Sequence, residues 1–351
     1  MGQVYDSGKF ESILDHGLAL ARWNDFAARE AESRARGKLR GRGLASFLEW
    51  TGGNAFEERV TVSVSGDGEI EVYASTMPMG QGIATSYAQL VVDVFGVPID
   101  KIRIVQGDTD RGSGFGSVGS RSLFTAGSAI NHASQTAVAM GRDLASDALE
   151  AAAADIEYHE GMFRVAGTDR QIGLFELAAR QPEHRIYVDS TSKVNGPSWP
   201  NACHVCEVEI DPQTGAVEVV SYVSANDVGR VVNPMIVRGQ LDGGAVQGLG
   251  QALGEYMRYD PASGQAITAS LMDYAMPRAD IVRDFVHVLD QSTPCLNNPL
   301  GVKGVGELGT IGATPALVNA VTDALVRAGR ADNADRLQMP LTPDKVWQAL
   351  R

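Results

Sequence analysis

The sequence predicts an α+β fold, with helices packed on mixed sheets in two related subdomains. Residues 60–73 and 205–223 each alternate apolar and polar side chains around a glycine-containing turn, which is typical of a β-hairpin. Each hairpin is followed by a Gly-Gln pair and by helical spacing of apolar residues. This recurring order indicates an internal repeat, with chance similarity as the alternative because few residues match.

Changes in pattern divide the chain into three parts. Residues 1–58 contain a charged segment with helical spacing, Phe10 to Ala35, and a basic connector, Lys38 to Arg42, which we expect to be a solvated loop. Residues 59–200 form the first α+β subdomain, and residues 201–351 form the second.

The remaining helices follow from spacing and from capping residues. We expect a helix over 84–95, a short strand over 102–105, and one long alanine-rich helix over 123–154 with a break near Gly141. In the second subdomain a helix is expected over 234–253. A last helix should begin with Thr314 as N-cap and Pro315 at the first helical position, and should stop before Gly329.

The 351-residue chain is acidic, with 43 Asp and Glu against 30 Lys and Arg and a formal net charge of −13. This charge argues against nucleic acid or an anionic membrane as a partner. Hydrophobic residues make up 44% of the chain, which argues against disorder. No apolar run is long enough to cross a membrane, and residues 1–10 lack the pattern of a secretory signal. We therefore expect a cytoplasmic protein.

The three cysteines do not form a disulfide framework. Cys203 and Cys206 form a C-x-x-C pair, but they lie in a segment that alternates like a strand. Residues three apart in a strand point to opposite faces, so these thiols are not expected to share a metal ion.

Several glycine-rich segments lie where helices are expected to begin. Gly80–Gly82 precedes one helix, Gly119–Ser122 precedes another, and the segment 301–312 places five glycines around Glu307. Such loops offer unpaired N–H groups that hold phosphate, and an arginine such as Arg121 can pair with phosphate at two points. Glu307, near a helix start, suits a general base, although it could instead cap a backbone amide. None of these loops matches the common nucleotide-binding motifs.

In combination and order, these motifs resemble the molybdopterin-binding large subunit of the xanthine dehydrogenase and aldehyde oxidase family. The matching segments are Met79–Gly82, Gly119–Ser122, Gly239–Gln240, and Gly304–Glu307 followed by Ile311–Ala313. The resemblance extends from about Tyr5 to Gly329 and implies the fold of the second molybdopterin-binding domain of those enzymes.

The resemblance implies a mechanism for the site. In that family, molybdenum is held by the dithiolene sulfurs of the pterin and not by protein atoms. Glu307 would take a proton from a molybdenum-bound hydroxide, whose oxygen attacks an electron-poor carbon of an aldehyde or N-heteroaromatic substrate. Electrons would then leave through iron–sulfur clusters and FAD.

The resemblance also assigns cofactor contacts. Gln81 would contact the metal's ligands or the pterin, with a helix-capping amide as the alternative. The residues expected to hold the pterin dinucleotide, in the cytosine form found in bacterial members, are Gly80, Gly82, Gly119, Ser120, Arg121, Ser122 and Gln240. The alternatives are an ion pair for Arg121 and a polar residue on an amphipathic helix for Gln240.

The chain resembles only the C-terminal half of that subunit, either because the subunit is split or because this is a fragment. Partners are therefore expected: a chain with the N-terminal half, an iron–sulfur subunit and a FAD subunit. Three alternatives to a hydroxylase subunit stay open. They are a subunit of a carbon monoxide dehydrogenase or aromatic-thioester reductase, a non-catalytic scaffold subunit, and an α+β protein that binds a phosphate-bearing ligand by itself.

Overall fold

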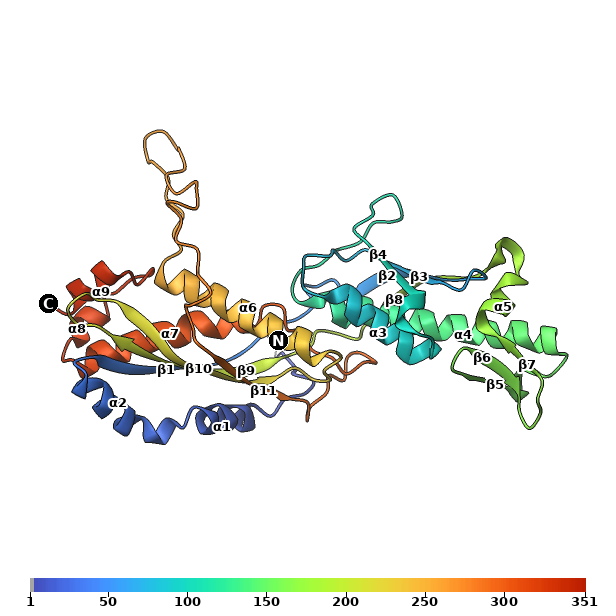
Figure 1. Ribbon diagram of the computed structural model, residues 1–351, viewed down its shortest axis with the longest axis horizontal. Helices are drawn as coiled ribbons and strands as arrows, with labels where there is room; N and C mark the ends of the chain where they lie inside the picture. Colours follow the sequence, from blue (N-terminus) through green and yellow to red (C-terminus); the bar gives the residue numbers. More distant parts are fainter. Residues whose placement is uncertain (1–2) are drawn as a thin grey trace.

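The computed structural model describes residues 3–351, which fold into two lobes that lie end to end along the long axis of the molecule (Figure 1). Each lobe contains a four-stranded mixed sheet with helices packed on it, so the predicted α+β class is confirmed. The first sheet contains β2 (Glu57–Ser65), β3 (Ile70–Ala74), β4 (Ile102–Gln106) and β8 (Arg185–Lys193). The second contains β1 (Leu39–Leu48), β9 (Asn201–Ile210), β10 (Val217–Asp227) and β11 (Phe285–Asp290).

The two sheets have the same spatial strand order and the same strand directions. The orders are β8-β2-β3-β4 and β1-β9-β10-β11, and in each the first three strands are antiparallel and the fourth is parallel to the third. A helix crosses from the third strand to the fourth in both lobes: α3 (Ile83–Phe95) in the first and α6 (Pro234–Leu253) in the second. A second long helix then packs on the first two strands, α4 (Ser128–Leu149) in one lobe and α7 (Leu308–Arg327) in the other. The two predicted hairpins therefore lie in two copies of one spatial arrangement, although the outer strand follows the hairpin in the first lobe (β8) and precedes it in the second (β1).

The first lobe buries an apolar core between its sheet and helices α3 and α4. A π-helical turn, Ser122–Gly127, leads into α4, and the predicted break near Gly141 is wrong. A Cβ at Gly141 would overlap the Phe163 ring, so this glycine serves close packing inside a continuous helix. A small sheet of β5 (Ile156–His159), β6 (Met162–Val165) and β7 (Gln171–Gly173) and the helix α5 (Leu174–Ala179) complete this lobe.

In the second lobe the predicted loop at Lys38–Arg42 is instead part of strand β1, which pairs with β9 along its whole length. Gly41 and Gly43 face α7, where a Cβ would overlap the helix backbone at Ala320 and Ala316. The alternating arginines face the other way, toward the N-terminal helices. Glycines occupy these two helix-facing positions, so alternation of hydrophobicity could not reveal the start of this strand.

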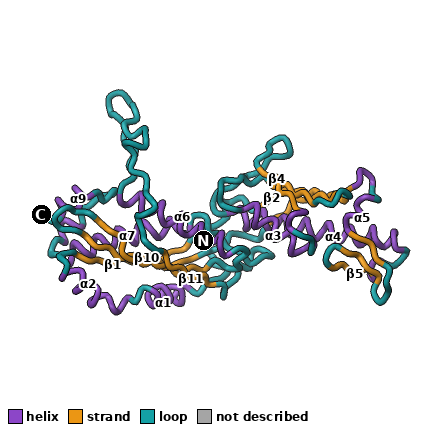
Figure 2. Tube along the Cα trace, viewed as in Figure 1, coloured by secondary structure: helices purple, strands orange, loops and turns teal. Residues whose placement is uncertain are grey.

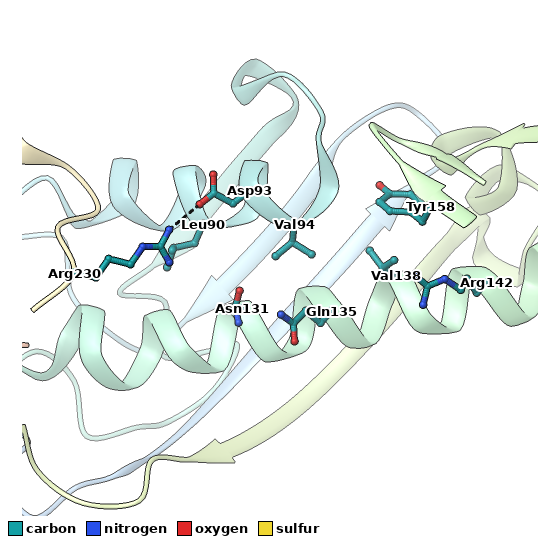
Figure 3. A pocket seen from close by; sticks show the side chains of 9 residues that line it. All are labelled: Leu90, Asp93, Val94, Asn131, Gln135, Val138, Arg142, Tyr158 and Arg230. Carbon is teal, nitrogen blue, oxygen red and sulfur yellow. Dashed lines mark hydrogen bonds and ion pairs between the residues drawn. The ribbon is translucent and has the colours of Figure 1, made fainter. Parts of the chain in front are cut away.

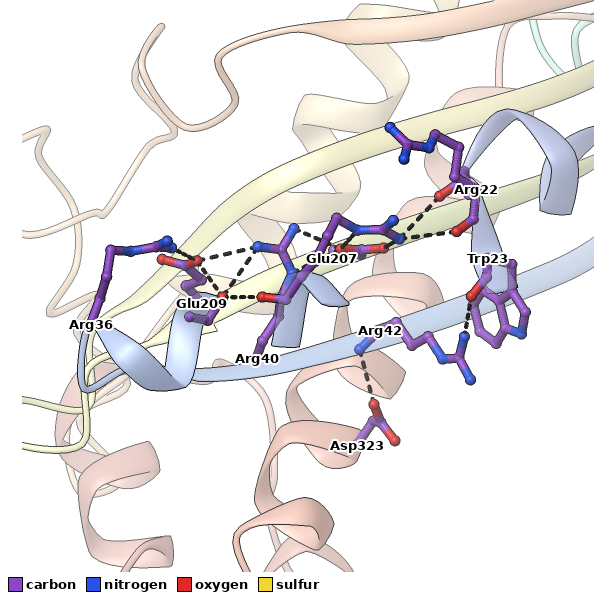
Figure 4. Close-up of polar contacts among 11 residues, drawn as sticks. Arg22, Trp23, Arg36, Arg40, Arg42, Glu207, Glu209 and Asp323 are labelled. Atoms are coloured by element: carbon purple, nitrogen blue, oxygen red, sulfur yellow. Dashed lines mark hydrogen bonds and ion pairs between the residues drawn. The ribbon is translucent and has the colours of Figure 1, made fainter. Parts of the chain in front are cut away.

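Helices α1 (Phe10–Leu20) and α2 (Phe26–Ala35) cover the face of this sheet opposite α7. Buried carboxylates on β9 hold α2 there (Figure 4). Glu207 accepts hydrogen bonds from Arg40 at 2.7 and 2.9 Å and from Arg29, while Glu209 pairs with Arg36 and Arg40. Charges that are this buried are tolerated because they are paired, which explains the arginine-rich N-terminal segment.

Helix α7 begins at Leu308, so the predicted start at Thr314 and Pro315 is wrong and Pro315 lies inside the helix. The first two turns pack closely on α6: a Cβ on Gly309 would lie 2.9 Å from the amide nitrogen of Ala245. This packing compensates for the hydrogen bond that proline cannot make. Glu307 therefore occupies the N-cap position itself.

Cys203 and Cys206 point to opposite faces of β9, as predicted: Cys203 packs in a cluster with Ile13, and Cys206 lies in the core with Leu317. Two long segments without regular structure leave the lobes, 107–120 after β4 and 254–284 after α6 (Figures 1 and 2). The remaining helical segments are α8 (Ala331–Ala334), α9 (Pro343–Ala349) and short 3₁₀ turns at Trp23–Asp25, Ile99–Lys101, Ala153–Asp155 and Pro182–His184. Across residues 3–351, no helix is both long and apolar enough to span a bilayer.

Candidate functional site

A cavity of about 260 Å³ lies between the two lobes, where four helical segments begin. Its wall contains residues from the starts of α3, of the π-helical turn before α4, of α6 and of α7. The lining residues are Met79, Gln81, Ile83, Ser86, Ser117, Val118, Ser120, Ser122, Leu123, Asn233, Ile236, Val237, Gln240, Lys303, Val305, Gly306 and Glu307. Equivalent helices of the two topological copies thus meet at one site.

Helix starts make this cavity suited to an anion. The first N–H groups of a helix have no partner within the helix, and its N-terminal end carries partial positive charge. Gly82, with φ 75°, occupies the N-cap of α3, and the Asn233 side chain caps α6 by accepting from the Ile236 N–H at 3.1 Å. Several such ends around one cavity favour a phosphate or another anionic group.

Glu307 and Ser120 contact each other across the boundary between the lobes. The Ser120 hydroxyl donates to Glu307 Oε2, and the Glu307 backbone N–H donates back to Ser120 Oγ at 3.0 Å. Ser120 has φ 53°, an uncommon left-handed conformation for a residue other than glycine. The backbone therefore holds this serine in a specific orientation, and the serine orients the carboxylate.

The other predicted site residues lie at or next to this cavity. Gln81, Ser122 and Gln240 line it, together with Ser120 and Glu307. Gln81 also closes its own loop, because its side chain accepts from the Met79 N–H at 2.7 Å and donates to the Met77 carbonyl at 2.8 Å. Gly80, Gly82 and Gly119 do not line the cavity themselves but are next to lining residues in the chain, and all three have positive φ.

Arg121 does not lie in the cavity, so the prediction that it holds phosphate is wrong. Its side chain is 0% exposed and donates to the carbonyls of Ala55, Gly116 and Glu57 at 2.8–3.0 Å. Its Nη2 also lies 2.8 Å from Glu58 Oε2, as an ion pair without hydrogen-bond geometry. The guanidinium is fully used inside the first lobe, where it holds the loop that carries Ser120.

Two buried ionisable residues near the site were missed from the sequence. Lys303 lines the cavity, and its Nζ lies 2.8 Å from Asp227 Oδ2, with both side chains 0% exposed. Glu49 is buried behind Ser120 and Glu307. Lys303 lies inside the glycine-rich motif and could have been noticed there, whereas Glu49 gave no signal because it follows a strand that the hydrophobic pattern did not reveal.

A second cavity, of about 550 Å³, is an open groove between α3 and α4 (Figure 3). Its rim carries Arg142 and an ion pair between Arg230 and Asp93 at 3.3 Å. None of the predicted site residues lines it, so the chemistry expected from the sequence belongs to the cavity between the lobes.

The residues of the cavity between the lobes suit a pterin-based cofactor. A Cβ on Gly80 would meet no atom within 4 Å, so a ligand has room to approach this backbone. Ser122 and Gln240 offer polar groups for a heterocycle, and Ile83, Val237 and Val305 provide apolar walls. Among residues 3–351, no group of three or more His, Cys, Asp or Glu side chains could hold a metal ion directly.

Comparison with known proteins agrees with this geometry. Residues 16–283 match the model of a molybdopterin cofactor-binding domain. The chain is 35% identical to the gamma subunit of the 6-hydroxypseudooxynicotine dehydrogenase complex of Paenarthrobacter nicotinovorans, over 98% of this chain and 44% of that protein. It is 30% identical to the carbon monoxide dehydrogenase large chain of Hydrogenophaga pseudoflava, over 100% of this chain and 46% of that one. The structure of quinoline 2-oxidoreductase from Pseudomonas putida 86 superposes with a TM-score of 0.87 at 32% identity, over 99% of this chain and 46% of that chain.

The chain therefore belongs to the molybdopterin-binding large subunits of the xanthine dehydrogenase and aldehyde oxidase family. It spans slightly less than half the length of the relatives it matches.

Proposed function

We propose that this chain forms one wall of the molybdopterin pocket of a molybdenum hydroxylase and contributes its general base, Glu307. The observation that carries the proposal is the convergence of Gln81, Ser120, Ser122, Gln240 and Glu307 on one cavity, from four helix starts in two lobes. A scaffold subunit would not need a carboxylate held by a serine at the N-cap of a helix. Family membership makes the pterin the natural ligand of this arrangement.

The bound cofactor would supply the redox chemistry, and the chain would supply binding, orientation and a base. The starts of α3 and of the π-helical turn would hold the anionic part of the cofactor through backbone N–H groups. Gln240 would donate to the heterocycle from the first turns of α6. Glu307, oriented by Ser120, would accept a proton from the oxygen nucleophile as it attacks the substrate.

We propose an N-heteroaromatic substrate, with an aldehyde as the second candidate. Two of the relatives described above are named for reactions of a nicotine derivative and of quinoline. A carbon monoxide dehydrogenase subunit is the competing function, because a relative of that name matches along the whole of this chain. Assays of N-heteroaromatic oxidation and of carbon monoxide oxidation by the purified protein would distinguish these two functions.

We also propose that the active enzyme needs partner polypeptide. The chain spans less than half of its relatives, and the cavity of about 260 Å³ is small for a pterin dinucleotide. The rest of the large subunit would close the pocket. An iron–sulfur subunit and a FAD subunit would carry the electrons away.

Cofactor analysis tests this function directly. The purified complex should contain molybdenum and release cytidine monophosphate on acid hydrolysis. Gly82→Val should lose the metal, because a β-branched residue is strained at φ 75° and its side chain would crowd Ile236, 3.0 Å from the added Cβ. Gly68→Val is the matched control: it has a similar φ of 91°, but its Cβ meets nothing within 4 Å. Full molybdenum content in Gly82→Val, or none in the wild-type complex, would refute the proposal.

A further inference from the structure

Glu49 is a buried carboxyl group that the proposed function does not use. It follows the end of β1 and is 5% exposed. Its backbone N–H donates to the Pro200 carbonyl at 2.8 Å, and the next contact along the chain, from the Thr51 N–H to the Ser198 carbonyl, measures 3.1 Å. Two backbone hydrogen bonds therefore fix the main chain of this segment, which holds the Glu49 side chain in the interior.

The environment of Glu49 favours its neutral form. Neither side-chain oxygen has a hydrogen-bond partner among residues 3–351. An ionised carboxylate without partners is very costly to bury, so such a group keeps its proton. Burial raises the pKa of Glu49 to about 8, the Ser120 hydroxyl opposes the rise, and the charge and the adjacent side chain of Glu307 raise the pKa further.

The charged groups around Glu49 leave it without a cation. Glu307, at the start of α7, is the titratable group that acts on it. Two buried basic residues of the loops at the site are already paired elsewhere, Arg121 with Glu58 and Lys303 with Asp227. Glu49 can therefore act on the site through two neighbours, the Ser120 hydroxyl and the Glu307 carboxylate.

The hydrogen bonds of Ser120 determine what Glu49 must do. A serine hydroxyl has one proton and two lone pairs. The proton is given to Glu307 Oε2, and one lone pair accepts the Glu307 backbone N–H at 3.0 Å. One lone pair is left, and it can be used only by a donor. A protonated Glu49 is such a donor, whereas an ionised Glu49 would compete with Glu307 for the single serine proton.

We propose that Glu49 is a positioning residue that holds a proton and donates it to Ser120 Oγ, so that the serine proton stays on Glu307. This inference rests on the proposed role of Glu307 as the base. Loss of the Glu49 proton would let the serine hydroxyl turn away from Glu307, which would then lose its orientation. The site would therefore have an upper pH limit set by Glu49, a residue that touches neither cofactor nor substrate.

Two variants separate this role from simple packing. Glu49→Gln keeps the shape and offers a permanent N–H donor, so it should mimic the protonated acid. Glu49→Leu fills similar space without a donor, so it should lower activity at every pH. If ionised Glu49 is inactive, the ratio of the Glu49→Gln rate to the wild-type rate should rise about tenfold from pH 7 to pH 9.

Infrared spectroscopy can detect the proton on Glu49 without any catalytic turnover. Infrared difference spectra of the purified complex should show the carbonyl band of a protonated carboxyl group at pH 7, and this band should disappear near pH 8. The band should be absent in Glu49→Gln. In Glu307→Gln it should disappear at a lower pH, because the neighbouring negative charge is gone. A complex that turns over but lacks this band, or whose Glu49→Gln variant has the wild-type pH profile, would overturn the inference. A complex that shows the band but has no molybdenum would support the proton on Glu49 and refute the proposed function.

Discussion

Replacing Arg121 by methionine should destabilise the protein strongly, because this arginine is structural and not a phosphate ligand. Methionine fills much of the same space but cannot donate. The change leaves three backbone carbonyls without donors and leaves Glu58, whose side chain is 1% exposed, without its cation. Breaking a buried ion pair from one side costs about 3–5 kcal/mol, which is a large share of the roughly 5–15 kcal/mol stability of a typical domain.

The free energy of unfolding, measured in urea, should therefore fall by about 3–5 kcal/mol in Arg121→Met. The double variant Arg121→Met with Glu58→Gln should recover part of this loss, because it no longer buries an unpaired charge. Arg283→Met is the matched control: Arg283 pairs with Glu218 at 2.9 Å, but both side chains are more than half exposed, so the cost should stay within about 1 kcal/mol. A loss below about 1 kcal/mol in Arg121→Met would refute the structural role that the buried contacts assign to it.

Two further predictions concern stability. Gly312→Ala should lower the free energy of unfolding by about 1–3 kcal/mol, because the new methyl group would overlap the Phe47 ring and the His204 imidazole. Gly239→Ala is the control on α6: no atom lies within 4 Å of its Cβ, so it should not destabilise the protein. Equal unfolding midpoints for the two variants would contradict this packing. The raised pKa of Glu49 means that the folded state keeps a proton that the unfolded state releases above its ordinary value of 4.5. The free energy of unfolding of the wild type should therefore fall relative to that of Glu49→Gln as pH rises from about 4.5 to 8, by on the order of 1.4 kcal/mol per pH unit. If the free energies of unfolding of the two proteins change in parallel with pH, Glu49 titrates normally and the prediction is wrong.

Much of the fold could be predicted because its strongest signals are local. Hairpins β2-β3 and β9-β10 alternate apolar and polar residues around glycine turns, and the helix expected over 234–253 has the bounds of α6. Strand β1 and the start of α7 were missed for one physical reason. Glycines in both segments are selected for close contact between a helix and its neighbour, and this contact joins residues far apart in the sequence.

The site residues also divide into those with a local sequence signal and those placed by contacts between distant segments. Gln81, Ser120, Ser122, Gln240 and Glu307 could be singled out because glycine-rich loops precede them, and the structure brings all five to one cavity. Arg121 lies in the same motif but turns into the protein, since Glu58 and three carbonyls surround it. No local pattern could show that direction. The position of Glu49 beside Ser120 and Glu307 depends on packing between the lobes, which no local sequence pattern encodes.

The central claim is that Glu307 is the base of a molybdenum hydroxylase site, and single-turnover reduction by substrate tests it most directly. Glu307→Gln keeps the shape of the side chain and the hydrogen bond from Ser120 but cannot accept a proton. We predict normal molybdenum content and a rate of reduction lower by at least roughly 10²–10⁴-fold, the usual effect of losing a general base. Glu176→Gln, an exposed residue in the first turn of α5, should leave both unchanged. Near-normal reduction by Glu307→Gln, with molybdenum retained, would contradict the claim.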